Sequence, residues 1–502
     1  MIDLALGAFA EVLTPATLGL ITLGLVIGIV IGAIPGLNVP LAVAIALPIT
    51  FKLSPIGGLA MLVGIYKGGT YGGSISAVLI NVPGTPAAAA TALDGAPLTR
   101  QGKAGKALRM SLYASIIAEF VSDIALILFA VPIALIALKI GPPETFAVGL
   151  FALALIGVLS EGNMLKGLMA GALGLFLSTF GVDPLTGDFR LTFGFHALSG
   201  GWSFIALVIG VFAVSEALIQ VERRYVAPVA GGAVRLSEPQ HRLTREDWRR
   251  SLPAIARSTP IGVLIGAIPG IGAAVSAYLN YGISRALSKE PERFGQGAIE
   301  GVAAAESGNN AVTASTFVPL LTLGVPGDVI TAIMLGAFLV HGLVPGPALF
   351  EKETAFVAAF FAMMVVTTLA HLVIGRLGLP LFVQTTRISN KLLFPAIMIL
   401  SVTGVYVTTN SSFDVFTMLG FGALGYAMLK TGFPIAPLMI GFILGPLIEV
   451  GLRQSMIMSR GSLEIFVTRP IAAAFLALAA TVVGIVAWRE WRGANVGIGG
   501  KA

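Results

Sequence analysis

The sequence predicts an all-α polytopic membrane protein, and three observations carry this prediction. Only 11% of the 502 residues are charged and 56% are hydrophobic, whereas about a quarter of the residues of an average soluble domain are charged. The mean hydropathy is +0.93. Long uncharged runs recur along the chain, and at about 20 apolar residues per crossing they leave room for roughly ten to fourteen transmembrane or re-entrant helices, some of them broken.

The composition also excludes several classes of function. The chain has no cysteine, and its four histidines are scattered, so we expect neither thiol chemistry nor a zinc site. No stretch matches the phosphate-binding loop of nucleotide hydrolases. We therefore expect no cofactor, no resident metal and no enzyme. The formal charge of +6 lies in short segments between apolar runs, which indicates membrane orientation and not nucleic-acid binding.

The phrase Gly-Ala-Ile-Pro-Gly occurs twice, at 32–36 and at 266–270. Each copy lies within a long apolar run, where proline removes a helix hydrogen bond and glycine loosens the backbone. At membrane depth such a break is tolerated only where it is buried in protein or lines a cavity. The phrase therefore predicts a broken helix beside an internal site that Asn38 could enter. The alternative is a plain helical hairpin with its turn at the membrane interface.

A second uncharged stretch, 68–93, is rich in Gly, Ser, Thr and Asn. This composition predicts either close helix packing or an unwound segment whose amides are open to a ligand. Lys67 precedes the stretch, and it is expected either to snorkel to the interface or to meet an anionic substrate. Glu119 and Asp123 lie one helical turn apart. They indicate a cation or proton site, or else two carboxylates near a helix end.

The chain divides into two sets of membrane helices around a basic linker. Residues 99–109 carry four basic residues and no acid, which places them in the cytoplasm. Thr244-Arg245-Glu246-Asp247 resembles a capping box and predicts a short cytoplasmic helix. The expected units are a first transmembrane half at 1–221, a cytoplasmic linker at 222–258, a second half at 259–490 and a cytoplasmic tail at 491–502. Ordinary spans are expected near 112–138, 145–160, 164–180, 202–221, 354–384, 392–408, 412–429, 434–451 and 470–488.

The two halves follow the same order. In each, the Ile-Pro-Gly break precedes a Val-Pro-Gly break, at 82–84 and 325–327, and then a Gly/Pro loop at 94–97 or 341–345. The first copy ends in a basic segment, whereas 341–353 carries two acids against one lysine, so the copies are expected to be inverted. Inverted halves with breaks at membrane depth are typical of a secondary transporter whose site lies between them.

The breaks also indicate the chemistry of the site. The N-terminus of a broken helix offers free N–H groups and a partial positive charge, which bind a carboxylate without a buried lysine. Free carbonyls and hydroxyls suit sodium. Asp328 follows the second Val-Pro-Gly, and a carboxylate inside the membrane is a candidate cation ligand or proton carrier. Glu306 and Asn310, one turn apart, are expected to face the same cavity, unless Glu306 begins a helix at the interface.

Several phrases together resemble the large permease subunit of tripartite tricarboxylate transporters, the TctA-type family. They lie at 32–37, 71–76, 81–86, 94–95, 300–311, 341–347 and 469–471. The resemblance implies a multi-pass permease of the bacterial inner membrane that works with a small membrane subunit (TctB-type) and a periplasmic solute-binding protein (TctC-type). It implies import of tricarboxylates or dicarboxylates, with a sodium ion or a proton as the coupling ion. A homodimer is compatible with it.

The resemblance further implies that the Tyr-Gly-Gly-Ser, Pro-Gly-Thr-Pro and Pro-Gly-Asp segments form the substrate and ion region. The expected cation-coupling residues are Asp328 and Glu306. The expected substrate-binding residues are Asn38, Tyr71, Gly72, Gly73, Ser74, Ser76, Asn81, Pro83, Gly84, Thr85, Asn309, Asn310, Gly324, Pro326 and Gly327. The family pattern has a small hydroxyl residue or glycine where Asp328 stands and a proline where Ala305 stands, so the coupling ion depends on what Asp328 does.

A rocking or elevator-like movement of the broken segments against the remaining helices is the expected mechanism. The second break of each half is the stronger candidate for the site, because the segments around it carry more polar groups than the Ile-Pro-Gly phrase does. The alternative function is a passive facilitator or channel for small organic anions. Accumulation of solute above equilibrium distinguishes the two.

Overall fold

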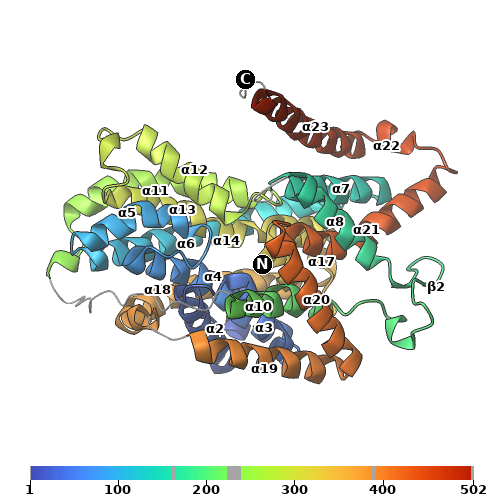
Figure 1. Cartoon of the computed structure of the whole chain (residues 1–502), viewed down its shortest axis with the longest axis horizontal. Helices are drawn as coiled ribbons and strands as arrows, with labels where there is room; N and C mark the ends of the chain where they lie inside the picture. Colours follow the sequence, from blue (N-terminus) through green and yellow to red (C-terminus); the bar gives the residue numbers. More distant parts are fainter. Residues whose placement is uncertain (1, 139, 160–163, 223–238, 387–389, 499–502) are drawn as a thin grey trace.

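The computed structural model describes residues 2–138, 140–159, 164–222, 239–386 and 390–498, and nearly all of their regular secondary structure is helical (Figure 1). Within these described ranges, six shorter apolar helices accompany six segments that are long and apolar enough to cross a membrane. The six long segments are α2 (Pro15–Ala33), α6 (Ala104–Ala137), the run Phe204–Glu222, α18 (Thr354–Thr385), α20 (Ser412–Lys430) and α21 (Ile435–Met458). The prediction of an all-α polytopic membrane protein is confirmed.

The first Ile-Pro-Gly phrase separates two helices, as predicted. α2 ends at Ala33, Gly36 has a positive φ of 86°, and α3 (Val39–Thr50) begins after Asn38. The side-chain oxygen of Asn38 accepts a hydrogen bond from the Leu41 N–H at 2.9 Å. An asparagine in this position satisfies one of the unpaired N–H groups at a helix start. The Asn38 amide is thus used as a helix cap.

Residues 55–80 form one continuous helix, α4 (Pro55–Ile80). For 68–80 the unwound alternative is therefore wrong, and the close-packing alternative is correct. A Cβ added at Gly28 of α2 would lie 2.4 Å from the Ile65 oxygen, and one at Gly72 would lie 2.5 Å from the Ile29 oxygen. Glycines on both helices let the two backbones touch, because no side chain fits between them.

α4 ends at the predicted Val-Pro-Gly break. Asn81 closes the helix with a left-handed backbone (φ 56°), and α5 (Ala88–Arg100) follows. The loop predicted at 94–97 is wrong, because these residues lie inside α5. Asp94 Oδ1 accepts the backbone N–H groups of Gly295, Gly297 and Ala298 at 2.8, 2.8 and 2.9 Å. A contact distant in sequence thus outweighs the local turn signal.

The second set of helices repeats this order. α11 (Arg245–Gly266) begins at the predicted capping box and runs across residue 258, and α12 (Gly272–Ala286) follows the second Ile-Pro-Gly. Next come α13 (Ile299–Asn310), α14 (Val312–Ser315) and α15 (Phe317–Leu323), then the Val-Pro-Gly break and α16 (Val329–Val340). The domain boundaries and the inverted orientation of the halves stay predictions.

Within each set the two breaks lie against each other. The Gly270 N–H donates to the Gly327 oxygen at 2.8 Å. In the first set, a Cβ added at Gly84 would lie 1.9 Å from the Gly32 oxygen. Each pair of breaks therefore shelters backbone groups that a membrane could not satisfy.

The other elements surround these helices. They are α1 (Ile2–Val12), α7 (Pro142–Leu159), α8 (Met164–Ser178), β1 (Gly181–Val182), β2 (Phe189–Arg190), η1 (His196–Leu198), α9 (Phe204–Ile209), η2 (Gly210–Val214), α10 (Ser215–Glu222), η3 (Pro239–His241), η4 (Pro291–Arg293), α17 (Pro347–Lys352), α19 (Asn390–Thr409), α22 (Ile465–Thr468) and α23 (Pro470–Ile498). α7, α8 and α21 pack together at one end, with α23 beside α7 (Figure 1). β1 and β2 pair antiparallel, with Gly181 opposite Arg190.

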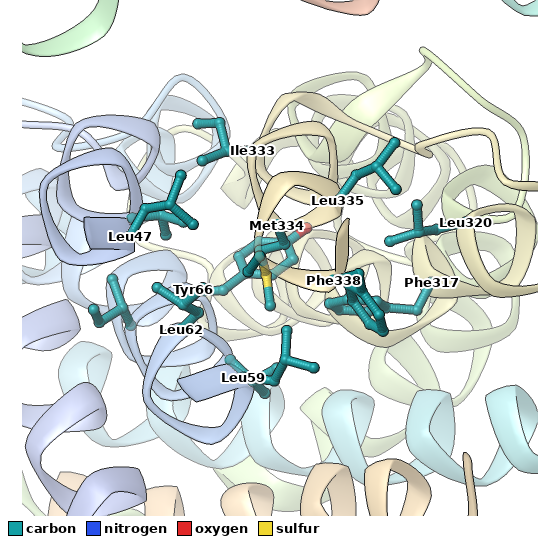
Figure 2. Packing of buried hydrophobic residues seen from close by; sticks show 14 of the residues in the cluster. Leu47, Leu59, Leu62, Tyr66, Phe317, Leu320, Ile333, Met334, Leu335 and Phe338 are labelled. Carbon is teal, nitrogen blue, oxygen red and sulfur yellow. The ribbon is translucent and has the colours of Figure 1, made fainter. Parts of the chain in front are cut away.

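The two sets share one hydrophobic core. Leu59 and Tyr66 of α4 pack in one buried cluster with Phe317 of α15 and Phe338 of α16 (Figure 2). The rings of Phe317 and Phe338 both contact Phe360 of α18, with centroids 5.2 and 5.6 Å apart. α6 packs on α13 and α18 packs on α4, so these two long helices connect the sets.

Replacing Gly28 with leucine should destabilise the protein by roughly 1–3 kcal/mol or more, because the new side chain meets helix backbone that cannot move aside. Gly19→Leu on the same helix is the control, since Gly19 is exposed and no atom lies within 4 Å of an added Cβ. Thermal unfolding in detergent should show a lowered midpoint for Gly28→Leu alone. Equal midpoints for the two variants would contradict the packing described.

Candidate substrate and ion site between the two halves

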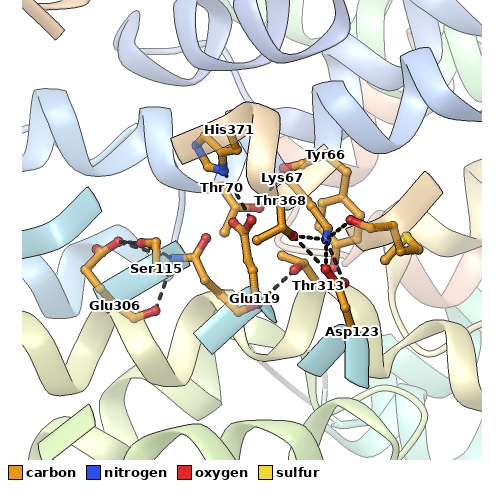
Figure 3. A network of polar contacts seen from close by, with 12 residues as sticks. Tyr66, Lys67, Thr70, Ser115, Glu119, Asp123, Glu306, Thr313, Thr368 and His371 are labelled. Carbon is orange, nitrogen blue, oxygen red and sulfur yellow. Dashed lines mark hydrogen bonds and ion pairs between the residues drawn. The ribbon is translucent and has the colours of Figure 1, made fainter. Parts of the chain in front are cut away.

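A cluster of polar side chains with no exposed surface lies where α4, α5, α6, α13 and α18 meet (Figure 3). We call it the polar cluster, and its members are Lys67, Tyr71, Ser74, Thr91, Ser115, Glu119, Asp123, Glu306, Asn309, Asn310, Thr368 and His371. Burying such groups costs free energy unless they find hydrogen-bond partners. The partners here come from different helices.

Glu306 joins the second half to the first. Its Oε1 accepts hydrogen bonds from the hydroxyls of Ser74 on α4 and Thr91 on α5. Its Oε2 accepts from Ser115 on α6 at 3.0 Å and from the Asn310 amide at 3.3 Å. The helix-start alternative for Glu306 is wrong, because it lies inside α13. The expected proximity of Glu306 and Asn310 is confirmed.

Lys67 forms a buried ion pair with Asp123. The Lys67 ammonium lies 2.7 Å from Asp123 Oδ1, and it also donates to the Thr368 hydroxyl at 2.6 Å and the Met364 carbonyl at 3.1 Å. An ammonium has three N–H donors, and these contacts use all three. Both expectations for Lys67 are therefore corrected, since it neither reaches the interface nor keeps a donor for a substrate.

Glu119 contacts His371 of α18, with Oε2 3.2 Å from Nδ1. The ring of Tyr71 packs against the same imidazole at 5.4 Å. Glu119 and Asp123 are buried in the middle of α6 and not near its end, so that alternative is wrong. His371 was missed by the sequence analysis, and the signal that could have found it is a lone histidine within an apolar span.

Several buried atoms of the polar cluster have no hydrogen-bond partner in the described structure. They are the Tyr71 hydroxyl, both polar atoms of Asn309, Asn310 Oδ1, Glu119 Oε1 and His371 Nε2. Each buried polar group left unpaired costs about 1–3 kcal/mol. Three of these residues, Tyr71, Asn309 and Asn310, are among the predicted substrate-binding residues. The polar cluster thus holds donors and acceptors that the protein itself does not use.

Asp328 is the N-cap of α16. Its Oδ1 accepts from the Thr331 N–H and hydroxyl, both at 2.8 Å, and its Oδ2 accepts from the Tyr66 hydroxyl at 2.6 Å. The carboxylate is half-buried. These contacts give Asp328 a structural role at the start of α16 and a link to α4, whereas its role in coupling is a prediction.

The remaining candidates lie at the breaks. The Gly84 N–H donates to the Gly73 oxygen at 3.1 Å, and the Thr85 hydroxyl accepts from the Ala88 N–H at 3.2 Å. The Ser76 hydroxyl bonds back to Gly73 within α4. The structure places Asn81 and Pro83 at an exposed end. On the other side, Gly324 ends α15 with φ 71°, and Gly324, Pro326 and Gly327 are buried.

The fold and the polar cluster define a polytopic membrane protein with broken helices and a polar interior. The chain belongs to the tripartite tricarboxylate transporter TctA family, whose model matches residues 18–440. This is the family of the large subunit of a tripartite system, and it is a transporter family and not an enzyme family.

Two relatives from Agrobacterium vitis are uncharacterized proteins. One, a 52.8 kDa protein in the TAR-I ttuC' 3' region, is 39% identical over 486 residues, which is 96% of each chain. The other, in the TAR-II ttuC' 3' region, is 42% identical over 217 residues, or 43% of this chain and 90% of the relative. No solved structure matches the chain.

Lys67→Met should cost about 3–5 kcal/mol of stability, because it leaves the Asp123 charge buried without a partner. The double variant Lys67→Met with Asp123→Leu should recover much of that loss, since no charge then remains buried. Lys430→Met is the control, because the Lys430–Glu222 pair is about half exposed and such pairs contribute about 0–1 kcal/mol. Unfolding midpoints measure all three. A double variant no more stable than Lys67→Met would contradict the buried pairing.

Proposed function

We propose that this chain is the large permease subunit of a binding-protein-dependent secondary transporter that imports tricarboxylates or dicarboxylates across the bacterial inner membrane. The observation that carries the proposal is the buried, incompletely bonded polar cluster between helices of the two halves. In alternating access, a substrate site opens first to one side of the membrane and then to the other. Such a site lies inside the protein, between the two halves. Membership of the TctA family supports the proposal.

A carboxylate would be bound by neutral donors. Lys67 is already neutralised by Asp123, so the site has no spare buried cation there. The Tyr71 hydroxyl and the Asn309 amide each offer an unused donor. The N-terminus of α16 is already capped by the Asp328 carboxylate. The break before α5 adds a helix N-terminus without a side-chain cap, whose N–H groups and dipole favour anions. Uncharged donors of this kind suit a substrate that must also be released.

The coupling ion, sodium or a proton, would act at Glu306 and Asp328. Both carboxylates accept hydrogen bonds from hydroxyls of the first half. Glu306 accepts them from Ser74 and Thr91, and Asp328 accepts one from Tyr66. Among the described residues no group of three or more His, Asp and Glu side chains can hold a metal ion. A sodium ion would therefore combine one carboxylate with hydroxyl and carbonyl oxygens, whereas a proton would need only the carboxylate.

The proposed complex contains a small membrane subunit of the TctB type and a periplasmic solute-binding protein of the TctC type, and the permease could be a homodimer. The family to which the chain belongs supports the first two partners. The binding protein would contribute much of the substrate selection. We propose that the broken helices move against the remaining scaffold by rocking or an elevator-like shift.

The complex, reconstituted with its partner subunits in proteoliposomes, tests the function with citrate and succinate as labelled probes. Imposed sodium and proton gradients are applied separately, and uptake above equilibrium is expected with one of them. Glu306→Gln should reduce this accumulation at least about tenfold, because the variant lacks the carboxylate whose charge the coupling ion would balance. Asp328→Asn should alter the ion dependence.

Glu353→Gln is the matched control, because Glu353 is an exposed carboxylate outside the polar cluster and its loss should leave uptake unchanged. Equilibration without accumulation in the unmodified complex would replace the proposal with a passive facilitator. Unchanged ion dependence in both Glu306→Gln and Asp328→Asn would remove these residues from coupling.

A further inference from the structure

A basic cavity lies apart from the polar cluster, where α6, α18 and the segment leading into α11 meet. Its volume is about 420 Å³, and its walls carry Arg109, Arg242 and Arg376 together with Tyr113, Trp248 and leucine side chains. None of the described residues that line it is acidic. Three guanidinium groups around one cavity whose described lining has no carboxylate make a strongly anion-attracting site.

Two of these arginines are available for a ligand. Arg242 and Arg376 are exposed, and neither forms an ion pair or hydrogen bond in the described structure. Arg109 is half-buried and donates from Nη1 to the His241 oxygen at 2.6 Å, which fixes its position. The arginines come from three separate elements, so the fold and not the local sequence brings them together.

The acidic residue closest in sequence to the residues that line the cavity already has partners of its own. Asp247 pairs with Lys106 at 2.8 Å and caps α11 through Thr244. Burial raises the pKa of Asp247, but the hydrogen bonds from Lys106 and Thr244 outweigh burial and hold the pKa below its usual value. Asp247 therefore stays charged and bound to these partners, and does not neutralise the cavity.

The apolar part of the cavity is suited to the membrane interface. The rings of Tyr113 and Trp248 pack with centroids 5.6 Å apart, and tyrosine and tryptophan favour the headgroup level of a bilayer. Beside Arg376, α18 carries an exposed apolar stripe at helical spacing, formed by Leu369, Val373, Leu377 and Leu381. Such a stripe offers a track for an acyl chain that a free anion would not need.

We propose that this cavity binds the phosphate of an anionic phospholipid, with an acyl chain lying along the stripe on α18. The planar guanidinium groups of Arg242 and Arg376 match phosphate oxygens in paired hydrogen bonds. The bound lipid joins α6 to α18 and α11 at the end of the molecule that carries the basic segments. α6 and α18 already touch there, because a Cβ added at Gly375 would lie 2.6 Å from Leu112, which also lines the cavity.

The full-length protein is purified and titrated with phosphatidylglycerol or cardiolipin in mixed micelles, with phosphatidylcholine and inorganic phosphate as separate arms. Thermal midpoint and bound lipid, counted by native mass spectrometry, are the readouts. The unmodified protein should retain anionic lipid and unfold at a higher temperature with it. Arg242→Gln with Arg376→Gln should weaken lipid binding by about tenfold or more, since each arginine near a lipid surface contributes about a factor of five.

Arg245→Gln with Arg249→Gln is the matched control, because both arginines are exposed near the same end, do not line the cavity and remove the same charge. The control should bind lipid as the unmodified protein does. Equal losses of lipid binding in the two double variants would overturn the proposal in favour of a non-specific attraction between basic residues and anionic lipid. If inorganic phosphate raised the thermal midpoint as much as the lipid does, and saturably, the ligand would be a free anion and not a phospholipid. Should the cavity variant fail to fold, Arg376→Gln alone is compared with Arg249→Gln.

Discussion

The structure depends on one constraint, which is that ionisable groups inside an apolar protein must find ionic or hydrogen-bonding partners within it. Asp123 is paired with Lys67, and the Thr368 hydroxyl bonds both. Among the residues that the structure describes, Glu306 has no cationic partner and is held by hydroxyls and an amide. Since the groups joined in this way belong to α4, α5, α6, α13 and α18, satisfying them also fixes where those helices lie. The polar cluster is thus both the candidate site and a connection between the halves.

The breaks obey the same constraint for the backbone. Asn38 caps α3, which follows the Ile-Pro-Gly break of the first half. Asp328 caps α16, which follows the Val-Pro-Gly break of the second half. The backbone bond from Gly270 to Gly327 satisfies further groups. Because the freed groups have protein partners, the breaks are compatible with a membrane interior. The Ile-Pro-Gly phrases serve as sheltered turns, whereas the atoms of the polar cluster without partners lie on α4, α6, α13 and α18.

Much of the fold could be predicted from the sequence because its signals are local. Proline and glycine in an apolar run indicate a break wherever the chain folds, and the spacing of Glu306 and Asn310 places both on one helix face. The pairing of Lys67 with Asp123 could not be predicted, because it depends on how α4 and α6 pack. The helix at 94–97 was missed for a similar reason, since Asp94 is held by backbone groups two hundred residues away in sequence.

The buried Lys67–Asp123 ion pair and the hydrogen bonds of Glu306 suit different parts of the proposed transport cycle. Separating Lys67 from Asp123 would leave two uncompensated charges in the interior, at a cost of several kcal/mol per ion. The contacts of Glu306 are replaceable, because a proton or a sodium ion can take the place of the hydroxyls that it holds. In the proposed cycle, the Lys67–Asp123 pair and its bonds to Thr368 would therefore keep α4, α6 and α18 together. Movement of α13 against these three helices would break the bonds of Glu306, and binding of the coupling ion would offset their loss.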